Sequence, residues 1–267
     1  MKIGTSIFNH LRMLRIDDWI KFYMAVPLAG ALLAGAVSAQ IILVIIIYFA
    51  IIGYAFTVNN YFDVEIDRLH SGKMKSNKNP LASRSVSRRG VLFMMLFQIG
   101  IALISLEMSY VGLCLVLLNL LLFTAYSGGV RLKEKFVLDI ITHGLMFGAV
   151  PFLAGFALSK GNITPEILLA SSLPFILAAE ALIAHQVVEY EEDVLSTRTT
   201  ITMIGKKNGL LLLGAAAAIS IVLLIFMTST KPLHIWALTA LGWYLIAYPA
   251  YSCRSLIRDF RHTASPQ

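Results

Sequence analysis

Charge is scarce in this sequence of 267 residues. Only 14% of the residues are Asp, Glu, Lys or Arg, whereas 58% are hydrophobic and the mean hydropathy is +0.76. Soluble domains carry about 25% charged residues, so this composition excludes a water-soluble globular protein and indicates a membrane protein. Acidic residues are the rarer sign, with 15 Asp and Glu against 22 Lys and Arg. The excess of basic residues favours contact with anionic lipid headgroups and anionic substrates, and no nucleic-acid partner is expected.

Cysteine is nearly absent. Cys114 and Cys253 both lie within or at the edge of apolar segments, so no disulfide framework is predicted. The first fifteen residues are mixed and basic and contain no apolar segment followed by small residues, so we expect no cleaved signal peptide. No Gly-rich motif ending in Lys and Ser or Thr occurs, which excludes a P-loop nucleotide site.

Long apolar segments are abundant. About 17 to 25 apolar residues suffice to cross a bilayer as a helix, and lipid offers no hydrogen-bond partner to an open strand edge. We therefore predict an all-α membrane protein with eight transmembrane helices around a central cavity. The predicted spans are 19–37, 41–58, 91–106, 110–126, 136–158, 167–184, 210–227 and 233–251.

Basic residues lie almost entirely on one side of these predicted spans. If the N-terminus is cytoplasmic, all but two of the 22 Lys and Arg fall in cytoplasmic segments, the exceptions being Lys160 and Lys231. Loops rich in Lys and Arg stay in the cytoplasm. We therefore predict an integral, multi-pass membrane protein with both termini in the cytoplasm.

Acidic residues gather at the ends of the second and sixth predicted helices. Seven of the fifteen lie in the segments 63–67 and 189–193, within predicted cytoplasmic loops 61–90 and 185–208. In each segment polar side chains recur at positions i, i+4 and i+8, which predicts that they share one helical face. The two sets are Asn59, Asp63 and Asp67, and His185, Glu189 and Asp193.

Each acidic segment is followed by a polar loop, and then by a basic pair and a glycine that lead into the next predicted helix. These are Arg88-Arg89-Gly90 in the first half and Lys206-Lys207-Asn208-Gly209 in the second. The chain 1–267 therefore resembles one four-helix unit used twice within a single membrane domain. Such pseudo-repeats would be related by an axis along the membrane normal, with the site at their interface.

Like-charged carboxylates one helical turn apart repel each other, and at a membrane edge they are poorly solvated, so a cation is expected beside them. Mg²⁺ accepts few carboxylate ligands, keeps waters and binds phosphate oxygens. One acidic cluster alone could equally be a solvated helix end, but two matched clusters favour a diphosphate site. A transition-metal site is less expected, because only His185 offers a nitrogen and no cysteine is near.

Three segments carry motifs of one family. Residues 59–67 read Asn-x-x-x-Asp-x-x-x-Asp and continue to Lys78-Asn79-Pro80, residues 126–133 contain Tyr-Ser followed by Arg and Lys, and residues 189–193 match a second Asp-x-x-x-Asp. At these positions, and over most of its length, the chain resembles the UbiA superfamily of intramembrane prenyltransferases. Three departures stand out: Glu189 replaces the usual Asp, Asn79 and His185 replace the common Arg and Asn, and eight spans are predicted where members typically have nine.

The resemblance implies Mg²⁺-dependent transfer of a prenyl group from an isoprenyl diphosphate, whose tail lies in an apolar cavity, to an aromatic or lipidic acceptor. Departure of diphosphate leaves an allylic cation, which the acceptor captures while water is excluded. The implied catalytic metal ligands are Asp63, Asp67, Glu189 and Asp193. The implied substrate-binding residues are Asn59, Lys78, Tyr126, Arg131, Lys133 and His185, of which the Lys and Arg side chains would neutralise the leaving group.

Residues around the first helix have two readings. Arg15 and Lys21 could both reach the diphosphate, and we include Lys21 among the candidate substrate-binding residues. Arg15 and Trp19 are interpreted as interfacial anchors, because basic and aromatic residues are common at that depth.

Three polar residues fall within predicted spans. Asp139 and His143, one turn apart, could orient the acceptor, act as a base or form hydrogen bonds between helices. Glu180 lies deep in the sixth predicted helix and is a candidate contact for the acceptor.

Other functions fit parts of the same pattern. Polyprenyl-phosphate phosphoribosyltransferases and terpene cyclases share the family's motifs. A cation transporter or channel is the alternative outside enzymes. It is disfavoured because both acidic segments are predicted on one side of the membrane, whereas a transport path needs polar groups across the bilayer.

Overall fold

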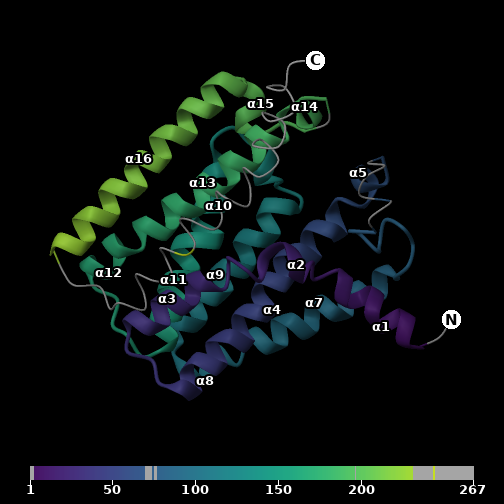
Figure 1. The fold of residues 1–267 in the computed structure, drawn as a ribbon. Helices are drawn as coiled ribbons and strands as arrows, with labels where there is room; N and C mark the ends of the chain where they lie inside the picture. Colours follow the sequence, from purple (N-terminus) through teal and green to yellow (C-terminus); the bar gives the residue numbers. More distant parts are fainter. Residues whose placement is uncertain (1–2, 70–73, 75–76, 196, 231–242, 244–267) are drawn as a thin grey trace, which may run out of the picture.

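The computed structural model describes residues 3–69, 74, 77–195, 197–230 and 243, and every regular element in that part of the chain is a helix (Figure 1). Six helices are long and apolar enough to cross a membrane. The predicted all-α membrane class is confirmed. The six spans are Ser38–Phe62, Arg88–Met108, Tyr110–Ser127, Leu138–Leu158, Pro165–Val188 and Lys206–Met227.

The first predicted span, 19–37, is wrong as one continuous helix. After α1 (Ile3–Arg12), the chain forms the short helix α2 (Ile16–Trp19), turns, and continues as α3 (Ala25–Leu33). The Trp19 side chain is fully buried and its indole N–H donates to the Leu14 carbonyl oxygen at 2.7 Å, so Trp19 is a core residue and not an interfacial anchor. The eighth predicted span, 233–251, lies outside the described residues apart from position 243.

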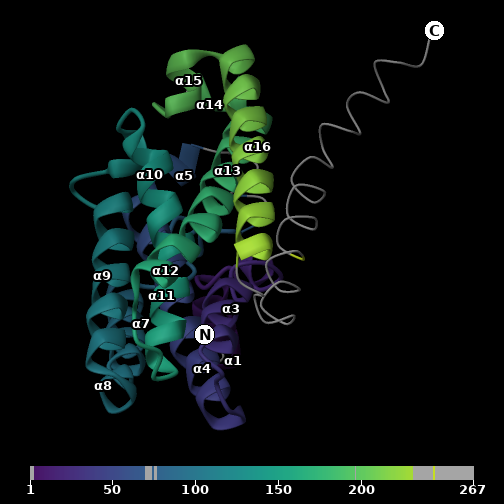
Figure 2. The same ribbon diagram turned by 90° about the vertical axis from the view of Figure 1, so that its left-hand side faces the viewer.

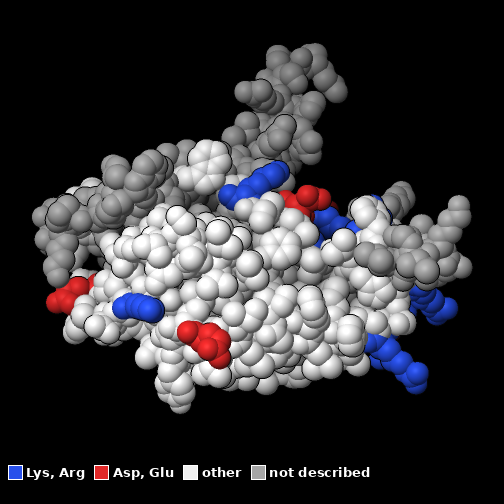
Figure 3. Space-filling view, turned by 90° about the horizontal axis from the view of Figure 1, so that it is seen from below, with Lys and Arg blue, Asp and Glu red and all other residues white. Residues whose placement is uncertain are grey.

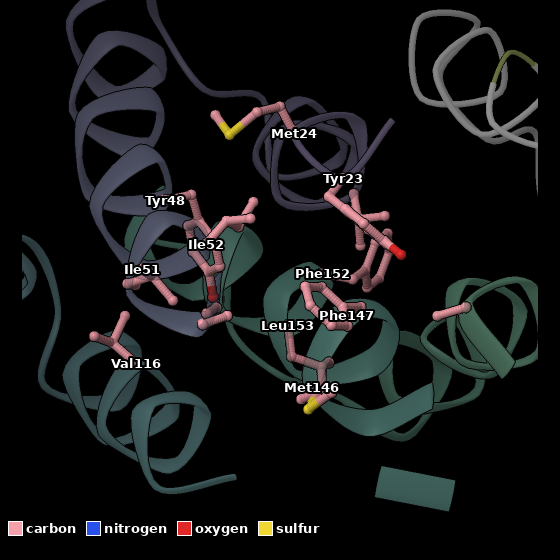
Figure 4. Packing of buried hydrophobic residues seen from close by; sticks show 14 of the residues in the cluster. Tyr23, Met24, Tyr48, Ile51, Ile52, Val116, Met146, Phe147, Phe152 and Leu153 are labelled. Atoms are coloured by element: carbon pink, nitrogen blue, oxygen red, sulfur yellow. The ribbon is translucent and has the colours of Figure 1, made fainter. Parts of the chain in front are cut away.

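The core lies where α3, α4 (Ser38–Phe62), α9 (Tyr110–Ser127) and α11 (Val150–Leu158) meet (Figure 4). Glycines bring α3 and α11 into backbone contact. A Cβ on Gly30 would overlap the carbonyl oxygen of Phe152, and a Cβ on Gly155 would overlap that of Pro27. Small residues at crossings of this kind let membrane helices approach closely.

The fifth predicted span is one long helix with a wider turn inside it. It consists of α10 (Leu138–Gly144), the π-helical turn η2 (Leu145–Ala149) and α11. The π turn packs against α13 (Ser172–Val188), which follows α12 (Pro165–Ala170). π turns within helices occur often at functional sites.

The remaining spans cover the outside of the bundle (Figure 2). The helices α7 (Arg88–Ala102) and α8 (Ser105–Met108) precede α9, and α7 packs on α4. The last described helix, α16 (Lys206–Thr230), follows α15 (Thr200–Ile204) and packs on α13. Charged side chains are few on the face of the molecule shown in Figure 3, as expected for a surface in contact with lipid.

Both acidic segments interrupt their helices at corresponding positions. α4 ends at Phe62 and α5 (Val64–Leu69) follows, while α13 ends at Val188 and α14 (Tyr190–Asp193) follows. The residues between them, Asp63 and Glu189, have nearly the same backbone angles, with φ −94° and ψ 11° and with φ −90° and ψ 9°. α5 and α14 lie at the same end of the bundle (Figures 1 and 2).

The i, i+4 hydrogen bonds continue through each interruption, from Asp67 N to Asp63 O at 2.8 Å and from Asp193 N to Glu189 O at 2.9 Å. The expected helical spacing is therefore kept locally, although the helices are not continuous. The matching interruptions are consistent with two pseudo-repeats, which stay a prediction, as does the cytoplasmic side of the termini.

Candidate active site

One cavity of about 440 Å³ is lined by residues at the ends of α4 and α13, the two helices that lead into the acidic segments. Asn59, one turn before the first acidic segment, lines it together with His185 and Glu189, whereas Asp63, Asp67 and Asp193 are not among its lining residues. Its other polar lining side chains include Arg15, Asp18, Lys78, Ser127 and Tyr126. Its apolar lining residues include Phe22, Phe56, Phe123, Met146, Phe147 and Leu182. The cavity thus joins a charged region to an apolar one.

Lys133 ties the first acidic segment to the loop after α9. Its ammonium is ion-paired with Asp63 and donates to Asn59 Oδ1 at 3.2 Å. Ser127 Oγ also donates to Asn59 Oδ1, at 3.2 Å. Burial lowers the pKa of Lys133, and the nearby Asp63 carboxylate opposes that shift. Asn59, Asp63 and Lys133, which the sequence analysis assigned to one site, therefore lie together.

Arg131 is the second cation beside Asp63. Its Nη2 lies 3.6 Å from Asp63 Oδ1, and its guanidinium is hydrogen-bonded to Glu134 in η1 (Leu132–Glu134). That hydrogen bond raises the pKa of Arg131 and lowers the pKa of Glu134. Arg131 is thus held in its charged form at the edge of the first acidic segment.

Asn79, which stands where family members commonly have Arg, is hydrogen-bonded to the first acidic segment. Its Nδ2 donates to Asp67 Oδ2 at 2.9 Å and to the backbone oxygen of Asn60 at 2.7 Å, and its Oδ1 accepts from the N–H groups of Leu81 and Ala82. Asn79 is buried. It fixes the polar loop against the acidic segment, and the sequence analysis did not assign it this role.

A second group of charges lies at the cavity around Asp18. Its Oδ2 is 2.6 Å from Arg15 Nη2 and 3.7 Å from Lys78 Nζ. All three residues line the cavity, so the interpretation of Arg15 as an interfacial anchor is wrong. Asp18 was missed by the sequence analysis, although its position three residues after Arg15 was a possible signal.

Asp139, which is fully buried, is hydrogen-bonded to residues on both sides of the second acidic segment. Its Oδ2 accepts from Thr200 N at 2.8 Å and from Gln186 Nε2 at 3.0 Å, and its Oδ1 accepts from the Thr200 hydroxyl. Asp139 does not line the cavity. Asp139 was expected to orient the acceptor, to act as a base or to form hydrogen bonds between helices, and the structure supports the last of these roles.

Comparison with known proteins identifies the family. The model of the UbiA prenyltransferase family matches residues 23–262. The chain belongs to this family. The family predicted from the motifs is confirmed, and with it the assignment as an integral membrane protein.

Among the relatives of this UbiA chain is a digeranylgeranylglyceryl phosphate synthase of Methanothermobacter thermautotrophicus. The two are 30% identical over 204 residues, which make up 74% of this chain and 66% of the relative. Solved structures agree with the UbiA fold. A UbiA homolog from Archaeoglobus fulgidus bound to GPP and Mg²⁺ has a TM-score of 0.77 at 21% identity, covering 91% of this chain and 86% of that one. A UbiA homolog from Aeropyrum pernix K1 has a TM-score of 0.67 at 19% identity, covering 89% and 97%.

The residues of the UbiA chain fit a magnesium ion by their chemistry. Asp63 Oδ1 is buried and has no hydrogen-bond partner among the described residues, and such an oxygen is a suitable ligand for a hard cation. No three His, Cys, Asp or Glu side chains in the described part of the chain form a ready metal cluster. Asp63, Asp67 and Asp193 instead have partners in the protein, respectively Lys133, Asn79 and Thr197. Metal binding by these residues stays a prediction.

Lys21 and Glu180 also lie outside the lining of the cavity, as do Arg131 and Lys133. The Lys21 side chain is exposed. Glu180 is 8% exposed and accepts from the Ser220 hydroxyl of α16 at 3.0 Å, a contact that joins two helices, and its contact with the acceptor stays a prediction. Glu189, in contrast, lies at the cavity, with His185 Nε2 3.4 Å from its Oε2.

Proposed function

We propose that this UbiA-family prenyltransferase transfers a prenyl group from an isoprenyl diphosphate to the free hydroxyl group of a prenylated glycerol phosphate, within the membrane and with Mg²⁺. The observation that carries the proposal is a cavity lined by Asn59, beside the first acidic segment, and by Glu189 of the second, with charged side chains that we assign to one end and apolar side chains that we assign to the other. A substrate with an anionic headgroup and an isoprenoid tail matches both ends.

The charged end suits a diphosphate. Asp63, Asp67, Glu189 and Asp193 are the proposed ligands of Mg²⁺, which when bound would neutralise phosphate charge. Two solved structures of a UbiA homolog from Archaeoglobus fulgidus contain Mg²⁺, one with GPP and one with DMAPP, which supports this donor class.

Cations of the chain itself are proposed to stabilise the leaving group. Lys133 and Arg131 flank Asp63, and Lys78 and Arg15 line the cavity. Negative charge grows on the diphosphate as its bond to C1 of the donor breaks, so fixed positive charges nearby lower the barrier. Asn59 and Ser127 supply neutral polar groups at the same end.

The apolar end suits the tail and the allylic cation. Phe123, Phe147 and Tyr126 line the cavity, and Phe123 and Phe147 have ring centroids 5.0 Å apart. Aromatic faces attract cations, and apolar walls exclude the water that would otherwise capture the cation. These residues are proposed to protect C1 until the acceptor attacks.

The choice of a lipid hydroxyl over an aromatic ring rests on the relative from Methanothermobacter thermautotrophicus, which is a digeranylgeranylglyceryl phosphate synthase. Its name describes a glyceryl phosphate that carries two prenyl groups. An acceptor with one prenyl ether and one free hydroxyl follows as the proposal for this chain.

The test is product analysis with the purified protein in lipid nanodiscs. Radiolabelled geranylgeranyl diphosphate and Mg²⁺ are supplied with a prenylated glycerol phosphate, an aromatic acid, a polyprenyl phosphate with phosphoribosyl diphosphate, or no acceptor. The expected product is a second ether on the glycerol phosphate. Labelled aromatic product, a cyclic hydrocarbon without acceptor, or a phosphoribosyl lipid would each overturn the proposed acceptor, and no product in any mixture would overturn the enzyme proposal.

A further inference from the structure

We propose that His143 is a catalytic residue, the general base that removes the proton from the acceptor hydroxyl. The inference rests on the proposed function, because only a hydroxyl acceptor needs a base at the moment when the new bond forms. His143 lines the cavity and is 6% exposed. Neither the Mg²⁺ proposal nor the diphosphate proposal uses it.

The position of His143 suits this role. On α10 it lies one turn before Met146 and Phe147, which line the apolar part of the cavity. Its ring centroid is 4.7 Å from that of Phe147 and 6.3 Å from that of Tyr126. α10 begins at the end of the bundle that carries the acidic segments (Figure 2). His143 therefore lies between the charged end, where the diphosphate is proposed, and the apolar end.

Hydrogen bonding fixes the form of the ring. Nδ1 lies 2.9 Å from the carbonyl oxygen of Ala178. A carbonyl oxygen can only accept, so Nδ1 carries the hydrogen and Nε2 of the neutral ring has a free lone pair. Because the two ring nitrogens point in nearly opposite directions, Nε2 faces away from α13, where Ala178 lies. No described residue forms a hydrogen bond with Nε2.

The step balances as follows. The bond between C1 of the donor and its diphosphate oxygen breaks, and the electron pair leaves with the diphosphate. A lone pair of the acceptor oxygen forms the new ether bond to C1, and the hydroxyl proton moves to Nε2 of His143. The resulting imidazolium keeps its hydrogen bond to Ala178 and later releases the proton to water at the charged end of the cavity. A base placed in this way contributes about 10² to 10⁴ in rate.

The test compares His143→Asn with the wild type on two acceptors in nanodiscs. An asparagine amide can replace the N–H that bonds to Ala178, but it cannot take a proton. The acceptors are the glycerol phosphate with one prenyl ether and a free hydroxyl, and the same molecule with a thiol in place of that hydroxyl. Thiols are far more acidic than alcohols, with cysteine ionising near pH 8.5, so at alkaline pH the thiol acceptor forms a thiolate without help from a base.

We expect His143→Asn to lower ether formation by about 10² to 10⁴ and to leave thioether formation near the wild-type rate. Ether formation at the wild-type rate, or an equal fall with both acceptors, would overturn the role of base. His143→Phe, which removes both nitrogens, separates packing from chemistry: its melting temperature should fall below that of His143→Asn. If the wild-type protein forms neither ether nor thioether, the proposed function itself fails, which is a different result from failure of the base alone.

Discussion

Asp139 and Thr200 are 61 residues apart in the sequence, yet the Asp139 carboxylate accepts hydrogen bonds from both the backbone N–H and the hydroxyl of Thr200. Thr200 Oγ1 also accepts from the backbone N–H of Val137 at 2.7 Å. Because Asp139 further accepts from Gln186, next to His185, it connects the start of α10 to both sides of the second acidic segment. We infer that it positions Glu189 for the cavity.

Asp139→Ala is expected to lower stability and activity together. It leaves the buried N–H groups of Thr200 and Gln186 without their acceptor, at a cost of about 3 kcal/mol. Thermal unfolding in detergent and the Mg²⁺ concentration for half-maximal activity are the measurements, and the latter should rise. Asp139→Asn keeps the shape and one acceptor oxygen, so it should lose less. Unchanged melting and Mg²⁺ dependence in Asp139→Ala would contradict the positioning role.

Asp63→Asn is expected to abolish turnover in a folded protein, and excess EDTA should abolish wild-type turnover reversibly. The reason is that Asp63 Oδ1 is a buried oxygen without a hydrogen-bond partner among the described residues, next to the proposed diphosphate position. The matched control is Glu65→Gln, since Glu65 is exposed and paired with Arg68. It should keep nearly full activity. Full turnover by Asp63→Asn in EDTA would rule out the metal proposal.

Lys133→Met is expected to lower turnover by about 10² to 10³, the loss seen when one preorganised charge or donor is removed from a transition state. The measured quantities are the rate of diphosphate release and the melting temperature. Lys135→Met is the control, because Lys135 follows closely in the chain but is exposed. Equal effects of the two substitutions would show that Lys133 acts only through the general charge of the loop.

Gly155→Ala is expected to destabilise the fold by more than about 1 kcal/mol, the lower range for overpacking. The added Cβ would overlap the backbone of Pro27, which cannot move aside as a side chain can. Gly100→Ala and Gly214→Ala are controls in α7 and α16, where a Cβ meets no atom within 4 Å. They should be neutral or stabilising. Thermal unfolding of the three variants decides the matter.

Features set by local composition were predictable. Apolar length located six of the spans, and acidic spacing located the segments that face the cavity at Asn59 and Glu189. The motif residues Asp63 and Lys133, which are 70 residues apart, were assigned to one site only through the family resemblance. Local pattern alone says nothing of such pairs, because it does not encode which helices become neighbours.

The errors and omissions have physical reasons of the same kind. An apolar segment that begins with a Trp predicts a transmembrane helix with that Trp at the membrane interface. Burial of Trp19 against the Leu14 carbonyl instead depends on the fold of the whole N-terminal segment. Asn79 is hydrogen-bonded to Asp67, and Asp18 is ion-paired with Lys78. Both contacts depend on how the loop folds back on the helices. Glu180 pairs with Ser220 of a helix that follows 40 residues later, so its direction could not be read from α13 alone.

The seam between α3 and α11 has a consequence for how substrates enter. At Gly30 and Gly155 the two helices touch through main-chain atoms, so no rotamer change can widen that wall. We therefore expect a long isoprenoid to enter through another part of the bundle, between helices whose contacts are made by side chains. The contact between α13 and α16, which includes the side-chain hydrogen bond of Glu180 with Ser220, is of this kind.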